Sequence, residues 1–172
     1  MENKRTIEPK FFQDDAETVA KELLGKFICR EFEDGTVWRW CITETEAYKN
    51  LEGVTYTSEM FRDTGKWCLY YGMLMINCNT DKGNDNVLIR ALDCVKGPCN
   101  IVDILKIKEI KNEVIGKDVL CYEKLWLEDW GVTVKKYDSK KRVGIVKKEE
   151  NKEAIKEKRN YQAKVICFPF FE

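Results

Sequence analysis

The sequence contains no histidine among its 172 residues. That absence excludes Ser-His and Cys-His dyads, imidazole metal ligands, and any side chain whose unperturbed pKa lies near neutrality. Acid and base chemistry must therefore come from carboxylates, tyrosine, lysine, cysteine or water. The sequence also lacks an apolar run as long as a membrane span, so we expect no transmembrane helix and no membrane partner.

Net charge is absent as well, because 30 basic residues balance 30 acidic ones. The charge is nevertheless unevenly spread along the chain. Residues 135–164 hold twelve Lys or Arg against five Asp or Glu, a net +7, whereas residues 1–134 carry a net −6. A basic stretch on a neutral chain is typical of a phosphate-binding edge or of a solvated charged face, and this feature alone does not separate the two.

The chain has eight cysteines, an even number that would suggest disulfides in a secreted protein. Its polar, charged N-terminal residues do not resemble a signal peptide, and a chain of this length buries a core without covalent staples. We therefore expect reduced, buried thiols, as in the apolar run at 27–29. Paired short spacings of a four-thiolate zinc site are missing, so we expect no metal.

The length favours one domain over residues 1–172 with mixed helices and strands. Asp14 and Asp15 precede apolar residues at helical spacing, which predicts a helix ending near Gly25. The dipeptide Asp34-Gly35 predicts a hairpin between strands at 26–33 and 36–48.

Further along, the apolar runs predict a second antiparallel strand pair at 67–79 and 87–92. Gly97-Pro98 predicts the start of another helix, because proline is favoured in a first turn. Short strands are predicted at 142–146 and 163–168.

The predicted strand at 36–48 carries an unusual row of side chains. Its even positions run from Trp38 through Ile42 to Glu44, Glu46 and Tyr48. Because side chains alternate along a strand, this places two carboxylates and a tyrosine in line with bulky apolar residues. Such a mixture is odd for an outer face and unfavourable for a core face.

Several blocks of sequence, among them ITETEAY at 42–48, YGM at 71–73 and LIRAL at 88–92, resemble the methylpurine (alkyladenine, 3-methyladenine) DNA glycosylase family, as a diverged member. The blocks begin with FF at 11–12 and residues 20–26, and they continue with the string ITETEAY at 42–48. The blocks that follow it in the family's order are MF at 60–61, YGM at 71–73, LIRAL at 88–92, KGP at 96–98, LWLE at 125–128 and RVGI at 142–145.

This resemblance implies an α+β fold: a single compact domain with a curved antiparallel sheet surrounded by helices, and no metal or redox cofactor. It implies a monofunctional DNA glycosylase of base excision repair that flips an alkylated or deaminated purine out of duplex DNA and hydrolyses its N-glycosidic bond. The partner would be double-stranded DNA containing damaged purines. We expect a monomer in an intracellular, DNA-associated location, the nucleus or the bacterial cytoplasm.

The resemblance also assigns roles to individual residues. Glu46 matches the catalytic glutamate that activates water, and Arg90 matches the arginine that helps to hold that water. Tyr48 matches the tyrosine that stacks on the flipped base, and Asn77 matches the asparagine that limits which purines fit. We expect Glu44 to have a supporting role, and the bland alternative for Arg90 is an ion pair with Glu44 or Glu46.

The remaining pocket residues depart from the family pattern. The residue that intercalates into DNA is expected to be Tyr71, with Tyr70 as the second choice. The family's pocket histidine falls on Thr57, which cannot stack on a purine but is expected to line the base site. The family also has an aromatic residue three positions before the intercalating one, as a further wall of the base site. That position falls on Cys68 if Tyr71 intercalates and on Trp67 if Tyr70 does. We therefore expect retained chemistry with weak or shifted base selectivity.

Two other functions remain open on the sequence. The first is a catalytically impaired paralogue that binds damaged DNA without base release. The second is a hydrolase of a small nucleoside-like substrate, which would need neither an intercalating residue nor a basic segment.

Overall fold

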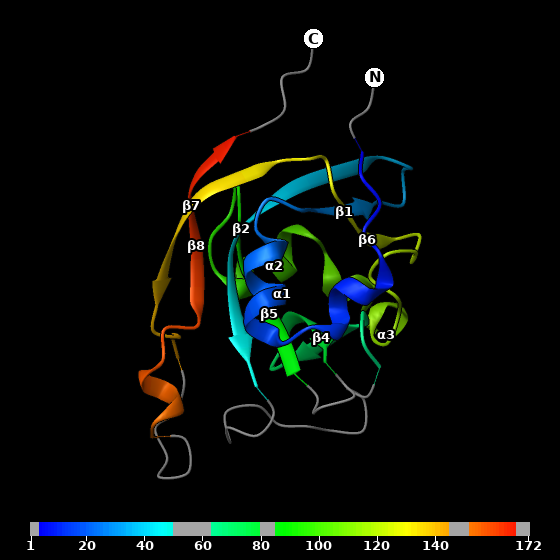
Figure 1. Ribbon diagram of the computed structural model, residues 1–172. Helices are drawn as coiled ribbons and strands as arrows, with labels where there is room; N and C mark the ends of the chain where they lie inside the picture. The colour runs from blue at the N-terminus through cyan, green and yellow to red at the C-terminus, as the bar shows by residue number, and fades with distance from the viewer. Residues whose placement is uncertain (1–3, 50–62, 80–84, 145–151, 168–172) are drawn as a thin grey trace.

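The computed structural model of the protein describes residues 4–49, 63–79, 85–144 and 152–167. A curved sheet surrounds two helices, α1 and α2 (Figure 1). The helical elements are η1 (Pro9–Gln13), α1 (Ala16–Leu23), α2 (Pro98–Ile104), η4 (Ile107–Glu109), α3 (Lys111–Val114) and η6 (Ala154–Lys156). The strands are β1 (Phe27–Glu31), β2 (Val37–Tyr48), β3 (Trp67–Tyr70), β4 (Met73–Cys78), β5 (Asp85–Leu92), β6 (Leu125–Glu128), β7 (Thr133–Lys140) and β8 (Asn160–Cys167).

The strands form one sheet in the order β3-β4-β5-β2-β1-β6, and β8 pairs with both β2 and β7. Each of these pairings is antiparallel. The first half of β2 pairs with β1, and its second half pairs with β5 and β8. The predicted mixed α/β class with a curved antiparallel sheet is confirmed.

Helix α1 forms where the capping signal predicts it. The Asp15 carboxylate accepts hydrogen bonds from the backbone N–H of Glu17 at 2.9 Å and of Thr18 at 3.4 Å, which satisfies two otherwise free donors. The apolar face of the helix is fully buried and packs against β2 and β5. Each large apolar side chain in that face contributes about 1.5–3 kcal/mol through burial.

The predicted strand at 67–79 is wrong, because the chain reverses in its middle. Tyr71 and Gly72 have φ angles of 48° and 75° and join β3 to β4 as a two-residue turn. Positive φ at both positions matches the right-handed twist of the flanking strands. The aromatic run therefore forms a hairpin of its own, and β5 is its third strand.

The C-terminal third also differs from the prediction. Strand β7 was not predicted, because its lysine-rich sequence is largely exposed and lacks an apolar alternation. Residues 141–144 are irregular rather than a strand, and 145–146 lie outside the described residues. Strand β8 confirms the predicted last strand and begins three residues earlier.

An irregularity in β2 explains the unusual row of side chains. The pairing register with β5 shifts on both sides of Glu44. Before the shift, the even residues Trp40 and Ile42 lie in the main core; after it, the odd residue Ala47 does. The bulge therefore turns Glu44 and the even positions that follow it away from the apolar core. The carboxylates therefore do not share a face with the main core.

Cysteine burial is as predicted at four positions and wrong at three. Seven cysteines in the described ranges are free thiols. The buried ones are Cys29, Cys41, Cys68 and Cys78, and the exposed ones are Cys94, Cys99 and Cys121. Among the described residues, no helix combines the length and apolar character needed to cross a membrane.

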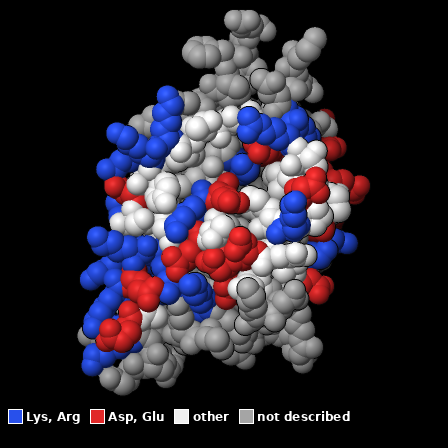
Figure 2. All heavy atoms as spheres, viewed as in Figure 1, with Lys and Arg blue, Asp and Glu red and all other residues white. Residues whose placement is uncertain are grey.

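The basic segment at 135–164 includes most of β7 and the first part of β8, two paired strands that we call the β7–β8 ribbon. Figure 2 shows lysine and arginine gathered along this edge of the molecule, while acidic residues concentrate over its centre. Lys135, Lys136, Lys140 and Lys164 are exposed on the two strands. One of these charges is neutralised locally, since Lys164 pairs with Asp138 at 2.8 Å.

Candidate active site

The centre of the candidate site is the Glu46 carboxylate, which is fully buried on β2. Its Oε1 atom accepts hydrogen bonds from the Val143 backbone N–H and from Asn160 Nδ2, both at 3.0 Å. Its Oε2 atom accepts one from the Tyr48 hydroxyl at 2.8 Å. A buried charge is tolerated only when it is hydrogen-bonded and paired, and Glu46 meets both conditions.

A second carboxylate and a cation complete this centre. Arg90 projects from β5 and places Nε 3.6 Å from Glu46 Oε1 and 3.7 Å from Glu44 Oε1. These distances define ion pairs but are too long for hydrogen bonds. Within the described residues, Arg90 Nε is buried without a hydrogen-bond partner. Arg90 therefore forms the ion pairs that a purely structural role would predict. The same ion pairs bring together Arg90, Glu44 and Glu46.

Tyr48 lies beside Glu46 and has one ring face covered. The guanidinium of Arg142 lies 5.1 Å from the centre of the Tyr48 ring, within the range of a cation–π contact. Arg142 is itself held by the carbonyls of Ala47 and Ala154 at 2.9 and 2.8 Å. Burial, followed by the negative charge of Glu46, raises the pKa of the Tyr48 hydroxyl, so the hydroxyl remains a donor.

Asn77 lies on the same face of the sheet within a small polar group. Cys68 on β3 directs its thiol towards Asn77 Oδ1 at 3.0 Å and Asn86 Oδ1 at 3.7 Å. Burial raises the pKa of the Cys68 thiol, which keeps it protonated as a donor. Asn77 Nδ2 is buried without a hydrogen-bond partner among the described residues. The amide therefore offers a free donor.

The two residues of β3 on which the family's aromatic wall could fall, Trp67 and Cys68, face opposite sides of the sheet. Trp67 lies in the main core and donates its indole N–H to the Leu125 carbonyl at 2.9 Å. Cys68 lies in a second cluster that faces the other way, which we call the outer cluster. The outer cluster consists of Cys68, Met75 and Leu88 with the partly buried Tyr48, Tyr70 and Met73. Of Trp67 and Cys68, the residue that shares the outer cluster with Tyr48 therefore carries a small thiol.

The two tyrosines of the hairpin have different environments. Tyr71 is 86% exposed at the turn, whereas Tyr70 is half-buried in the outer cluster. Their rings meet edge to face at 4.6 Å between centroids and 71° between planes. Tyr71 therefore carries the exposed ring of the pair, and Tyr70 packs against it. Thr57 lies outside the described residues.

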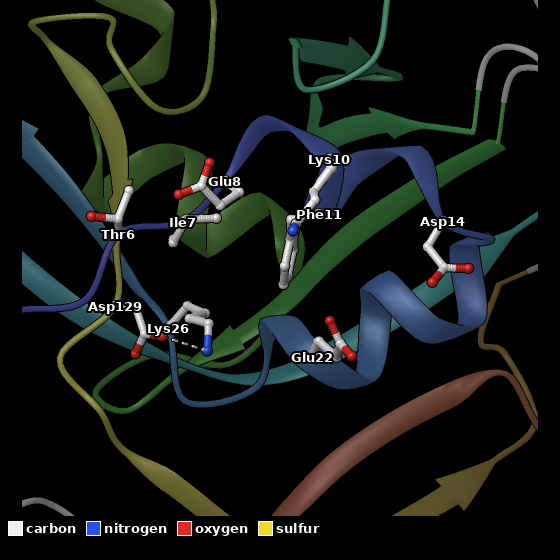
Figure 3. Close-up of a pocket in the computed structure, with 9 residues that line it drawn as sticks. All are labelled: Thr6, Ile7, Glu8, Lys10, Phe11, Asp14, Glu22, Lys26 and Asp129. Atoms are coloured by element: carbon white, nitrogen blue, oxygen red, sulfur yellow. Dashed lines mark ion pairs between the residues drawn. The ribbon is translucent and has the colours of Figure 1, made fainter.

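A cleft of about 600 Å³ lies away from these residues. It opens between the N-terminal segment and α1, where Lys26 and Asp129 form an ion pair at 3.1 Å (Figure 3). Helix α1 covers the core side of β2, whereas Glu46 faces the opposite side. Cleft size is therefore a poor guide here, because the pairing of ionisable groups points to β2 and β5.

The sequence did not single out several residues that complete the site. Asn160 donates to both carboxylates, and Val143 and Arg142 come from a block that matched the family without an assigned role. Asn86 adjoins Asn77 across the β4–β5 pairing. In the parts of the chain that the structure describes, no three Cys, Asp or Glu side chains are arranged to hold a metal ion.

The arrangement can perform acid–base chemistry on a neutral or cationic ligand. Glu46 Oε2 accepts one hydrogen bond among the described residues, so it retains lone-pair capacity for a proton. Tyr48 offers an aromatic surface and Asn77 a directed donor on the same side of the sheet. These are the parts needed to stack a planar ring, to read its edge, and to deprotonate a water molecule.

Comparison with known proteins identifies the family. The family model described as methylpurine-DNA glycosylase matches residues 10–97, just over half of the chain. The matched range contains Glu46, Tyr48, Asn77 and Arg90. The chain belongs to the methylpurine-DNA glycosylase family.

Individual relatives agree with this result. The chain is 34% identical over 102 residues to the DNA-3-methyladenine glycosylase of Mus musculus, covering 52% of this chain and 31% of that protein. It is 34% identical over 119 residues to a Clostridium botulinum protein provisionally named a 3-methyladenine DNA glycosylase, covering 60% of this chain and 56% of that protein. The matches thus span about a third to just over half of these relatives.

Proposed function

We propose that this protein is a monofunctional DNA glycosylase that hydrolyses the N-glycosidic bond of an alkylated or deaminated purine in duplex DNA. The observation that carries the proposal is the buried Glu46 carboxylate, held beside Arg90 and Tyr48 on one face of the sheet. Membership of the family supports the reaction class. The duplex substrate, a monomeric state and a DNA-associated location belong to the same proposal.

Glu46 would act as the general base. Hydrolysis passes through an oxocarbenium-like transition state, which needs a positioned water and a carboxylate to deprotonate it. The water oxygen forms a bond to the sugar C1′, Glu46 takes the water's proton, and the purine leaves with the electron pair of the broken C1′–N bond. Arg90 would help to hold the water near the sugar and phosphate.

Base recognition falls to the outer face of the sheet. Tyr48 would stack on the flipped purine, a contact worth about 1–3 kcal/mol. Asn77 Nδ2, which lacks a partner among the described residues, would meet the edge of the base. Tyr71 would enter the duplex and fill the space left by the flipped nucleotide, which offsets an unstacking cost of a few kcal/mol. We further propose that Thr57 contributes to the base site.

The basic β7–β8 ribbon would contact DNA phosphates. Strand β8 pairs with β2 at Glu46, so the ribbon starts beside the candidate site. Its exposed lysines lie on both strands. Phosphate contacts supply affinity without sequence preference and make binding sensitive to salt.

A second function is favoured by the altered pocket. Cys68 stands where the family resemblance places an aromatic wall, and Arg90 is already paired with two carboxylates. A protein with these features would bind damaged DNA while releasing no base. Retention of the buried Glu46 favours the enzyme over this alternative, because an unused buried carboxylate is costly to keep.

The test is base release from a duplex with a single hypoxanthine or methylated purine, measured as alkali-labile strand breaks. Wild type should release the base, and E46Q should reduce release by about 100-fold or more, since general-base catalysis contributes about 10²–10⁴. The matched control is E17Q, because Glu17 also accepts a tyrosine hydroxyl, at 3.0 Å, on the α1 side of the sheet. E17Q should release base at the wild-type rate.

Three results would redirect the proposal. Equal background from wild type and E46Q, with tight damage-dependent binding, would establish the non-catalytic binder. Hydrolysis of free nucleosides that survives Y70A/Y71A would establish the small-molecule hydrolase. An equal loss in E46Q and E17Q would show that the effect of E46Q is general destabilisation.

A further inference from the structure

Asn160, the first residue of β8, bridges the two carboxylates of the site. Its side chain is 1% exposed, and its backbone lies directly opposite Glu46 in the β2–β8 pairing. Asn160 Nδ2 donates to Glu44 Oε1 at 2.7 Å and to Glu46 Oε1 at 3.0 Å. An amide nitrogen has two N–H donors, so each of them serves a different carboxylate.

The bridge formed by Asn160 reduces the electrostatic repulsion between the Glu44 and Glu46 carboxylates. Two carboxylates on one face of a strand repel each other strongly where water is excluded, and the usual outcome is that one of them takes up a proton. Arg90 Nε lies 3.6–3.7 Å from the two Oε1 atoms that Asn160 binds. The same pair of oxygens therefore contacts a cation from β5 and a neutral double donor from β8.

Packing alone does not account for an asparagine here. Asn160 Oδ1 is buried without a hydrogen-bond partner among the described residues. An unpaired buried acceptor is unfavourable, and a leucine of similar size would avoid it. The amide nitrogen donates to both carboxylates, whereas the amide oxygen accepts no hydrogen bond from the described residues. The contacts with the carboxylates therefore explain why an asparagine occupies this position.

We infer that Asn160 is a positioning residue that bridges the Glu44 and Glu46 carboxylates, offsets their mutual repulsion, and directs Glu46 Oε2 towards the reacting water. This inference deepens the proposed function and depends on it. With Oε1 held by Asn160 and by the Val143 N–H, the carboxylate cannot rotate about its own axis without losing two hydrogen bonds. The orientation of Oε2 is thereby set before substrate binds, which is how positioning groups lower a barrier.

The groups that face Glu46 come from every neighbouring element. They are Glu44 and Tyr48 on β2, Arg90 on β5, Asn160 on β8, and Arg142 with the Val143 N–H from the segment after β7. Glu44 is the acidic member of this set that shares both Asn160 and Arg90 with Glu46. Removing Asn160 should therefore change the interaction between Glu44 and Glu46.

The test compares N160L with wild type in single-turnover base release and in duplex binding. Loss of a charge-assisted donor should lower the rate by about 10- to 100-fold. Affinity for the damaged duplex should stay within about twofold, because Asn160 is buried and contacts the carboxylates rather than the surface. The acidic limb of the pH–rate profile should move to higher pH.

Two further variants separate positioning from folding. In an E44Q background, N160L should lower the rate of base release by less than about threefold, because the repulsion between the two carboxylates has been removed. N160D keeps the size of the side chain, and its rate relative to wild type should fall further as the pH rises from 5 to 8. The control Y161F removes a hydrogen bond of 3.0 Å to a carboxylate from the next residue of β8 and should leave the rate unchanged.

The inference would be overturned if N160L lowered the rate of base release equally in the wild-type and E44Q backgrounds. It would also be overturned if Y161F lowered the rate as much as N160L does. A readout without catalysis separates it from the proposed function. The difference in Tm between wild type and N160L should grow from pH 5 to pH 8 and shrink in the E44Q background. If wild type releases no base but this pattern holds, the proposed function fails and the carboxylate bridge stands. If the pattern is absent, the bridge fails.

Discussion

Tyr71 combines a strained backbone with an exposed side chain, so replacing it should affect stability and DNA chemistry differently. Its φ of 48° is unfavourable for a residue with a Cβ, at a cost of about 1–2 kcal/mol, and asparagine tolerates this region far better. Y71N would create Asn-Gly, the preferred pair for this turn. The lost edge-to-face contact with Tyr70 is worth about 0.5–1.5 kcal/mol.

These terms nearly cancel, and the ring is 86% exposed, so little burial is lost. The free energy of unfolding of Y71N, measured by urea titration, should stay within about 1 kcal/mol of wild type. Base release from duplex DNA should fall by about 5- to 150-fold, which corresponds to a stacking contact of about 1–3 kcal/mol.

Single-stranded substrate provides the internal control for Y71N. A strand without a partner has no stacked gap to fill, so its base release should change much less. A loss of the same size on single and double strands would refute the intercalation argument. So would an unchanged rate on the duplex, because the hairpin itself is expected to stay folded.

Two further predictions concern charge. Glu128 is 3% exposed; burial opposes its ionisation, but hydrogen bonds from Lys4, Trp126, Arg39 and Trp130 lower its pKa from 4.5 to about 2. The stabilisation that Glu128 contributes to folding is present above pH 4.5 and is lost as the pH falls towards 2. E128Q should therefore lower the free energy of unfolding, measured by urea titration, by about 3 kcal/mol at pH 7 and by about half of that at pH 3. An equal loss at both pH values would contradict this prediction. Replacing Lys135 and Lys136 of the β7–β8 ribbon by alanine should weaken duplex binding alike for damaged and intact DNA and lower the salt slope by about 1 per phosphate contact; an unchanged slope would assign these lysines to a solvated face.

Signals that depend only on neighbouring residues were readable from the sequence. The Asp15 cap of α1, the turn at 34–35 between β1 and β2, and the start of α2 at Pro98 all occur where they were predicted. Each of them works through hydrogen bonds or dihedral restrictions within a few residues. The predicted strand at 36–48 likewise placed Glu46 and Tyr48 on one face, because strand alternation is local.

Features that depend on strand register were not readable in this way. The turn at 71–72 was hidden in an aromatic run, and β7 was hidden because its exposed lysines show no alternation. Whether Trp67 or Cys68 faces the base side depends on how β3 pairs with β4. A shift of one residue would exchange them, so composition cannot decide the question.

The missing histidine of the sequence excluded imidazole chemistry and left carboxylates, tyrosine, lysine, cysteine or water as the acid–base groups. Only the tertiary structure brought Asn160, which lies 114 residues from Glu46 along the chain, into hydrogen-bond contact with it. That contact depends on the pairing of β8 with β2, and the bulge in β2 turns both carboxylates away from the core. Local patterns determined which groups can react, whereas long-range pairing decided how those groups are held.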